Sequence, residues 1–121
     1  PNRGSEVARR WRERSLYRLL YREAAGWQLG EPAEEIERIC GVPEDIEWGI
    51  VMGTVATGLR DSMFGGPHDG VVSHAEMRMP GIPALPVPGN HTLFLYLPEM
   101  WHAVVGFLER GHFPAGAATR C

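Results

Sequence analysis

The sequence predicts an α/β protein built on parallel strands with flanking helices, of which this chain supplies only a part. The length of 121 residues, with 44% apolar and 22% charged side chains, is that of one globular domain. Two short apolar runs, at 48–56 and from Ala84 to Val87, are typical of strands, and a helical pattern lies between them. Parallel strands need neighbours on both sides and helices on both faces, so two strands leave the sheet incomplete.

The first 47 residues are predicted to be a helical segment. Ser5 is suited to cap a helix over about Glu6 to Glu23, because apolar side chains recur behind it at roughly helical spacing. Gly-Glu-Pro at 30–32 and Gly-Val-Pro at 41–43 then enclose a short acidic helix from Ala33 to Ile39.

Residues 48–113 alternate between strand, loop and helix. The run from Trp48 to Ala56 is nearly continuously apolar, as in strands buried on both faces. A glycine-rich loop at 64–70 follows, and then a short helix from Val72 to Met79 that Pro80 closes. The second strand, at 84–87, runs into a Pro-Gly-Asn-His turn.

The clearest helix lies near the end of the sequence. Pro98 suits its first position, Glu99 its first turn, and Gly111 ends it. Apolar residues at i, i+3, i+4 and i+7 form a stripe that consists of Trp101, Val104, Val105 and Leu108. Residues 114–121 form a tail.

An aspartate and a histidine follow the two predicted strands. Asp69 lies in the glycine-rich loop, and His91 comes directly after the second strand. The carboxyl ends of parallel strands meet at one edge of a sheet, where a carboxylate can orient an imidazole that acts as general base and acid. The spacing alone leaves open that Asp69 only caps a turn and His91 is an ordinary loop residue. A shorter distance from His91 to Glu76 or Asp61 would also mean that the acid is misassigned.

From Gly49 to Phe113 the chain resembles the C-terminal end of lipases and esterases of the α/β-hydrolase fold. The shared features are a strand, an Asp-Gly loop, a helix, a second strand, a His-Thr turn and a final helix. They read Pro67-His68-Asp69-Gly70-Val71-Val72-Ser73, Ala75-Glu76-Met77-Arg78, His91-Thr92 and Pro98-Glu99, with an ending of Phe107-Leu108-Glu109-Arg110-Gly111-His112-Phe113. Pro1-Asn2-Arg3-Gly4-Ser5-Glu6-Val7 resembles the segment after the strand that follows the nucleophile elbow. Family members commonly have Asn in place of His68.

The resemblance implies a carboxylic-ester hydrolase with a Ser-Asp-His triad, in which Asp69 is the acid and His91 the histidine. The chain has no Gly-x-Ser-x-Gly, and the triad order of this fold puts the serine and both oxyanion donors upstream of Pro1. We therefore expect the chain to be the C-terminal portion of the fold. Its expected partners are the missing N-terminal part and a small-molecule or lipid ester substrate, with no cofactor. Residues 1–47 then correspond to a cap, whose lipid-facing lining would be Trp11, Leu16, Leu19 and Leu20.

Other side chains give weaker indications. The serines lack the strand-to-helix glycine context of a nucleophile; they are Ser5, Ser15, Ser62 and Ser73. His68, Asp69 and His74 lack a zinc spacing, and Cys40 and Cys121 form neither a metal motif nor a disulfide framework. His102 and His112 are predicted to be solvated.

The charge distribution suggests an alternative function. Pro1 to Glu23 carries seven arginines against three glutamates, although the formal net charge of the chain is −3. A four-residue step along one helical face, made by Arg10, Arg14, Arg18 and Arg22, can contact phosphates or an anionic membrane surface. The alternative is thus a non-catalytic α/β module whose arginine-rich helix binds an anionic partner. Interleaved glutamates favour a solvated face, and the acidic chain indicates no nucleic-acid partner.

No apolar run is long enough for a membrane-spanning helix. The chain begins at Pro1 with no secretory signal, so its start is either processed or lost. Localisation cannot be read from it, and the cytoplasm is the favoured compartment.

Overall fold

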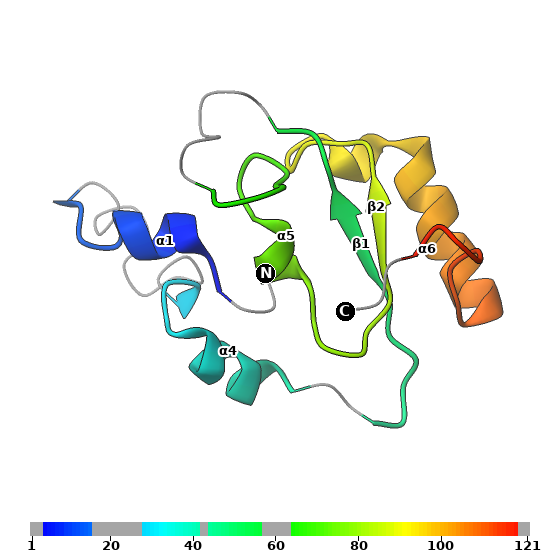
Figure 1. The fold of residues 1–121 in the computed structure, drawn as a ribbon, viewed down its shortest axis with the longest axis horizontal. Coiled ribbons are helices and arrows are strands. Elements are labelled where there is room, and N and C mark those ends of the chain that lie inside the picture. Colours follow the sequence, from blue (N-terminus) through cyan, green and yellow to red (C-terminus); the bar gives the residue numbers. More distant parts are fainter. Residues whose placement is uncertain (1–3, 16–27, 42–43, 57–63, 119–121) are drawn as a thin grey trace.

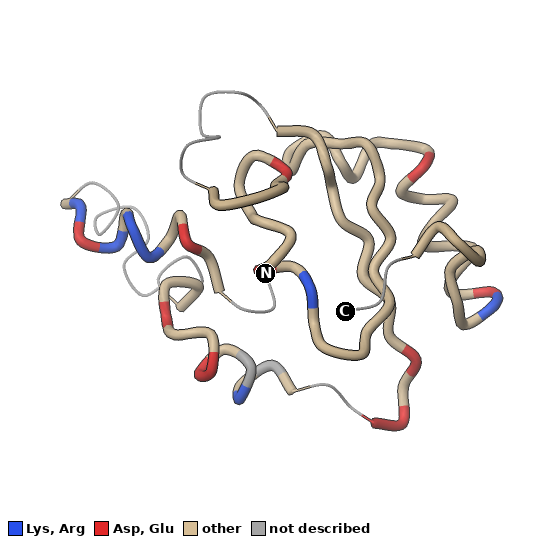
Figure 2. Tube along the Cα trace, viewed as in Figure 1, with Lys and Arg blue, Asp and Glu red and all other residues tan. Residues whose placement is uncertain are grey.

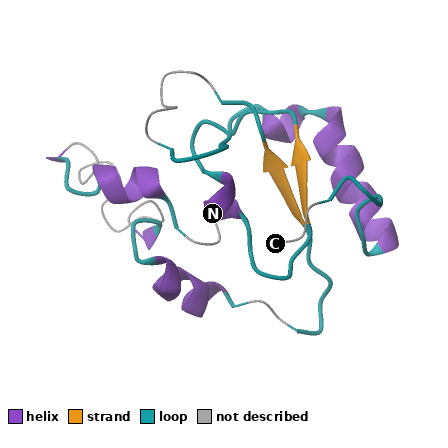
Figure 3. Cartoon of the chain, in the orientation of Figure 1, coloured by secondary structure: helices purple, strands orange, loops and turns teal. Residues whose placement is uncertain are grey.

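The computed structural model describes residues 4–15, 28–41, 44–56 and 64–118, which form a mixed α/β arrangement (Figure 1). The elements in chain order are α1 (Glu6–Trp11), α4 (Ala33–Cys40), β1 (Ile50–Gly53), α5 (His74–Met77), β2 (Ala84–Val87), the 3-10 helix η2 (Phe94–Tyr96) and α6 (Pro98–Arg110). The strands lie between α5 and α6, and α1 and α4 lie beyond α5 (Figure 3).

The two strands pair in parallel, which confirms the pairing predicted from the sequence. Ile50 lies opposite Ala84, and Gly53 lies opposite Val87. The pairing continues past β1, because the amide of Thr54 donates to the carbonyl of Val87 at 3.2 Å. Both carboxyl ends point the same way, so the segments that follow the strands leave from the same end of the sheet (Figure 1).

Pro86 marks β2 as an edge strand. The carbonyls of Pro83 and Val87 both accept hydrogen bonds from the β1 side, so alternation along β2 turns the backbone of Pro86 away from β1. Proline has no N–H with which to pair a further strand on that side. Within the described residues β2 is the only strand beside β1, and a larger sheet would have to continue on the other side of β1.

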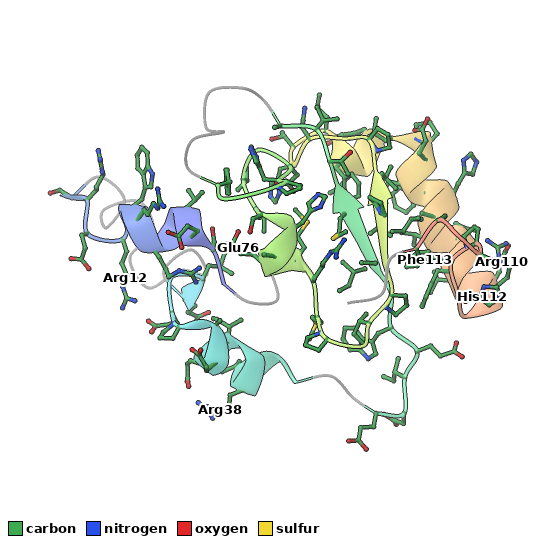
Figure 4. All side chains as sticks on the ribbon, viewed as in Figure 1. Arg12, Arg38, Glu76, Arg110, His112 and Phe113 are labelled. Atoms are coloured by element: carbon green, nitrogen blue, oxygen red, sulfur yellow. The ribbon has the colours of Figure 1, made fainter. Side chains whose placement is uncertain are left out.

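Helix α6 covers the sheet with a face of small and flexible side chains. Its buried positions are Met100, Ala103 and Gly106. Ala103 packs with Val87 and Phe113 in the core, where Phe113 lies beside α6 (Figure 4). Pro98 stands at the start of the helix and Gly111 ends it with a φ of 73°, as the sequence predicts.

The apolar stripe of α6 lies mostly outside this contact. Trp101 and Leu108 are 54% and 77% exposed, and in η2 Tyr96 is 81% exposed. A helix that covers only two strands needs one narrow buried face, and the smaller side chains supply it. The face of η2 and α6 therefore presents apolar side chains to solvent. Of the helices in the described ranges, none is both long and apolar enough to cross a membrane.

Helix α1 covers less of the chain than the predicted helix from Glu6 to Glu23. Ser5 caps it as predicted, with its Oγ accepting from the amide of Ala8 at 3.3 Å. The helix ends at Trp11, and a turn follows at 12–14. The rest of that prediction lies outside the described residues, including Leu16, Arg18, Leu19, Leu20 and Arg22. Helix α4 confirms the short acidic helix.

Helix α5 and strand β1 differ from the prediction in extent or burial. Helix α5 has four residues only, because Arg78 is extended and Pro80 disfavours helix at the residue before it. The run at 48–56 was expected to be buried on both faces, but within it only Met52 and Gly53 are buried. The reason is that β1 has one neighbouring strand in the described residues rather than two.

Candidate active site

The loop after β1 holds Asp69 in a closed turn. Its Oδ1 accepts from the amides of Val71 at 3.0 Å and Val72 at 2.8 Å, and its own amide donates to the carbonyl of Val72. Aspartate favours such turns because its side chain bonds the backbone two and three residues on. Gly70 has a φ of 98°, a conformation that residues with a Cβ rarely adopt. The turn therefore fixes the carboxylate through one of its two oxygens.

The second oxygen of Asp69 binds His91. The Oδ2 to Nδ1 distance is 2.8 Å, so the structure brings together the two side chains singled out in the sequence. A carboxylate only accepts hydrogen bonds, so Nδ1 carries the proton of the neutral ring. Nε2 is then the unprotonated nitrogen, and it can take a proton from a nucleophile.

The turn after β2 orients His91 further. The backbone amide of His91 donates to the carbonyl of Asp69 at 2.9 Å. The Asn90 side chain accepts from the amides of Thr92 at 3.1 Å and Leu93 at 2.9 Å. The backbone and the ring of His91 are thus both tied to the acid loop, and Asn90 fixes the turn that carries it.

The acid is buried and the imidazole is accessible. The Asp69 side chain is 8% exposed, whereas that of His91 is 47% exposed. An open pocket of about 290 Å³ lies at the pair, and it is lined by Asp69, Gly70, Val71, Asn90, His91, Thr92 and Leu93. A buried acid strengthens the hydrogen bond that orients the ring, while the exposed ring can reach a reacting group.

Two glycines allow the loops to approach the strand ends. A Cβ at Gly53 would lie 2.6 Å from the carbonyl oxygen of Gly89 and 3.1 Å from Cβ of Asp69. A Cβ at Gly89 would lie 2.5 Å from Cδ1 of Leu97. Position 53 therefore needs glycine, because the atom in the way belongs to the backbone, whereas at position 89 it is the end of a flexible side chain.

His68 and His74 support the acid loop. His68 is buried, its Nδ1 accepts from the amide of Gly70 at 3.1 Å, and its ring stacks on Phe64. His74 donates from Nε2 to the carbonyl of Gly53 at 3.0 Å. Neither histidine lines the pocket beside His91. Among the residues that the structure describes, no group of three or more potential ligands is placed to hold a metal ion.

Neither Ser5, Ser73 nor Glu76 is bonded to His91. Ser5 and Ser73 cap α1 and α5. Glu76 accepts hydrogen bonds from Ser73 rather than from His91. Asp61, Ser62 and Cys121 lie outside the described residues. Glu76 is the supporting residue that sequence reasoning missed, although a serine followed three residues later by glutamate is a capping-box signal.

The arginines of α1 and of its C-cap are paired with nearby carboxylates. Arg9 and Arg10 lie 3.2 Å and 2.8 Å from Glu6, and Arg12 lies 3.2 Å from Glu31. The hydrogen bond from Arg10, with a further one from Arg9, holds the pKa of Glu6 below its ordinary value. Figure 2 shows both signs of charge close together along this segment, while the two strands carry neither.

Comparisons with protein-family models, curated proteins and solved structures find no match to this chain. The candidate site is therefore defined by its own geometry. That geometry supplies an oriented base, and the described residues that line the pocket include no serine or cysteine.

Proposed function

We propose that the chain carries the acid and the base of a carboxylic-ester hydrolase with a Ser-Asp-His triad, whose serine lies upstream of Pro1. The chain would then be the C-terminal portion of an α/β-hydrolase fold of the lipase and esterase kind. The observation that carries the proposal is the 2.8 Å hydrogen bond between Oδ2 of Asp69 and Nδ1 of His91. Asp69 holds the tautomer and balances the charge of the imidazolium, and His91 removes the serine proton and returns it to the leaving alkoxide.

The open side of His91 is where the nucleophile would act. A serine Oγ must come within about 3.2 Å of Nε2 to transfer its proton, and the pocket at the ring leaves space for it. Val71 and Leu93 line the same pocket, and their apolar side chains suit the alkyl part of an ester. These features support a small-molecule or lipid ester as the substrate class.

The surface of the sheet supports an incomplete fold. Pro86 disfavours a further strand beside β2, so additional strands would join through β1. The apolar face of η2 and α6 is also the kind of surface that a larger assembly covers. An upstream part of the fold would supply strands beside β1 and would cover the apolar face of η2 and α6.

The alternative of an anionic partner for the arginine-rich helix has less support. Of the stripe that the sequence suggested, Arg10 pairs with Glu6 at 2.8 Å and Arg14 lies beyond the end of α1. Arg18 and Arg22 lie outside the described residues. A phosphate or lipid headgroup would have to compete with the pair at Arg10.

The test is ester turnover by the full-length parent protein. Asp69→Asn and His91→Ala should each lower turnover by several orders of magnitude, about 10⁴ for the aspartate by analogy with the serine-protease triad. His68→Ala and His74→Ala should cost far less, because neither ring lines the pocket, and the exposed His102→Ala should cost nothing. Similar losses in all five variants would contradict the assignment.

A further inference from the structure

Glu76 is a buried carboxylate outside the candidate active site. Its side chain is 8% exposed, although glutamate is rarely so buried unless it is paired. It lies on the part of α5 that faces α1 (Figure 4). A buried carboxylate is costly unless both of its oxygens are satisfied, so its partners indicate what it holds together.

The two oxygens of Glu76 bind two distant parts of the chain. Oε2 accepts from the amide and the hydroxyl of Ser73, both at 2.8 Å. Oγ of Ser73 accepts in turn from the amide of Glu76 at 3.3 Å, which completes the capping box of α5. Oε1 accepts from the amide of Glu6, the first residue of α1, and lies 3.6 Å from Nη2 of Arg9. A capping box needs only the first set of contacts. The second set joins α5 to a helix 70 residues earlier in the chain.

Ser73 connects Glu76 to the acid loop. It follows directly on Val72, whose amide and carbonyl both bond to Asp69. Ser73 also forms an antiparallel bridge with His68, on the other side of Asp69. Residues 68–73 therefore form a closed loop whose last residue is held by Glu76, and a shift of Ser73 displaces the amides that fix Oδ1 of Asp69.

We propose that Glu76 is a positioning residue that couples the docking of α1 to the geometry of the Asp69–His91 pair. When α1 is docked, the Glu6 amide and Arg9 hold one oxygen of Glu76, and the other oxygen holds Ser73. When α1 undocks, the carboxylate loses two donors and turns toward water, which loosens Ser73 and the turn around Asp69. The coupling itself does not depend on the hydrolase proposal, and only its consequence for ester turnover rests on that function.

The experiment uses the whole chain and two NMR readouts that need no activity. Long-range proton–nitrogen correlations distinguish the Nδ1–H from the Nε2–H tautomer of His91. Amide hydrogen exchange of Val71 and Val72 reports the turn that holds Asp69. The perturbing variants are Glu76→Gln and Arg9→Met, of which the second removes the α1 guanidinium from Glu76 together with its pair to Glu6. The matched control is Arg10→Met, because Arg10 is the next residue of the same helix, pairs with Glu6 at 2.8 Å and is 53% exposed.

We expect Arg9→Met to speed exchange of the Val71 and Val72 amides by about two- to fivefold, the effect of losing a partly exposed ion pair, and Glu76→Gln to speed it at least as much. Both variants should also populate the Nε2–H tautomer of His91, whereas Arg10→Met should leave both readouts at their original values. The variant that combines Arg9→Met with Glu76→Gln should show the same exchange rates and tautomer as Glu76→Gln alone, because Arg9 acts through Glu76.

Three results would overturn the proposal. They are unchanged readouts in Arg9→Met, equal changes in Arg10→Met, and additive effects in the double variant. If Glu76→Gln does not fold, the comparison of Arg9→Met with Arg10→Met still tests whether the contact of α1 with Glu76 affects His91. None of these results bears on whether the parent hydrolyses esters, so failure of the coupling and failure of the proposed function are distinguishable.

Discussion

Replacing Asp69 by asparagine should reverse the tautomer of His91. Oδ1 of Asp69 accepts from two backbone amides, and Oδ2 accepts from the ring of His91. An asparagine has only one carbonyl oxygen. If that oxygen stays with the two amides, the NH₂ group faces Nδ1 of His91, which must then become an acceptor and leave the proton on Nε2.

The number of hydrogen bonds at Oδ1 sets the size of the preference for the Nε2–H tautomer. If the asparagine turned its NH₂ group toward the amides of Val71 and Val72, these two donors would lose their acceptor. If it keeps its carbonyl oxygen on them, the His91 ring only has to move its proton from Nδ1 to Nε2. An unsatisfied buried donor costs about 1–3 kcal/mol. A difference of about 2 kcal/mol corresponds to roughly thirtyfold, so more than about 90% of the molecules should hold the Nε2–H tautomer. Nε2 then cannot act as a base, which is the reason for the expected loss of turnover in the parent.

The assay is the long-range proton–nitrogen NMR spectrum of the labelled chain, recorded at about pH 8.5, where ordinary histidines are neutral. The original chain should show His91 as Nδ1–H, and Asp69→Asn should show it as Nε2–H. Asp45→Asn is the matched control, since Asp45 is an exposed aspartate away from the pocket. A His91 ring that stays Nδ1–H in Asp69→Asn would refute the role of the two oxygens.

Four further results are expected. The chain alone should not turn over short p-nitrophenyl esters, since acid and base without a nucleophile leave nothing to acylate; turnover abolished by a serine-directed phosphonate would contradict this. The chain should self-associate in sedimentation through its exposed apolar face; a monomer with a sharp thermal transition and slow amide exchange throughout would count against an incomplete fold. Gly53→Ala should lower stability in urea by about 1–3 kcal/mol and shift the NMR signals of Asp69. Gly65→Ala, where a Cβ meets nothing within 4 Å, should do neither, and equal effects would refute the packing argument. Finally, the protection of the α1 amides against hydrogen exchange, measured relative to the intrinsic exchange rate at each pH, should fall in acid. The pKa of Glu6 is lowered from 4.5 by Arg10 and Arg9, so its stabilisation is present above about pH 4.5 and is lost as the pH falls through the lower, folded value. A protection of the α1 amides that stays constant on acidification would contradict that contribution.

The sequence predicts the elements that single residues decide. Ser5 accepts from an amide of the first turn of α1, Pro98 has a backbone angle suited to a helix start, and Gly111 adopts the left-handed conformation that ends α6. The proximity of Asp69 to His91 is predictable for a similar reason. Each follows a strand, and parallel strands end at the same edge.

Other features depend on contacts between distant segments. The apolar stripe of α6 contains its larger side chains, yet the buried face is Met100, Ala103 and Gly106, because the fit to two short strands decides which face is covered. The link from Glu76 to Glu6 depends on where α1 lies, and spacing along the chain carries no signal of it. The need for glycine at position 53 likewise arises from the approach of Gly89.

In the proposed function His91 serves a serine encoded upstream of Pro1. The most direct measurement is to react the full-length parent with a fluorophosphonate and to map the modified residue by mass spectrometry, in the original protein and in His91→Ala. We expect modification of the serine in an upstream Gly-x-Ser-x-Gly, at a rate that falls by orders of magnitude in His91→Ala. A reading frame without such a serine, or a rate of modification that does not depend on His91, would contradict it.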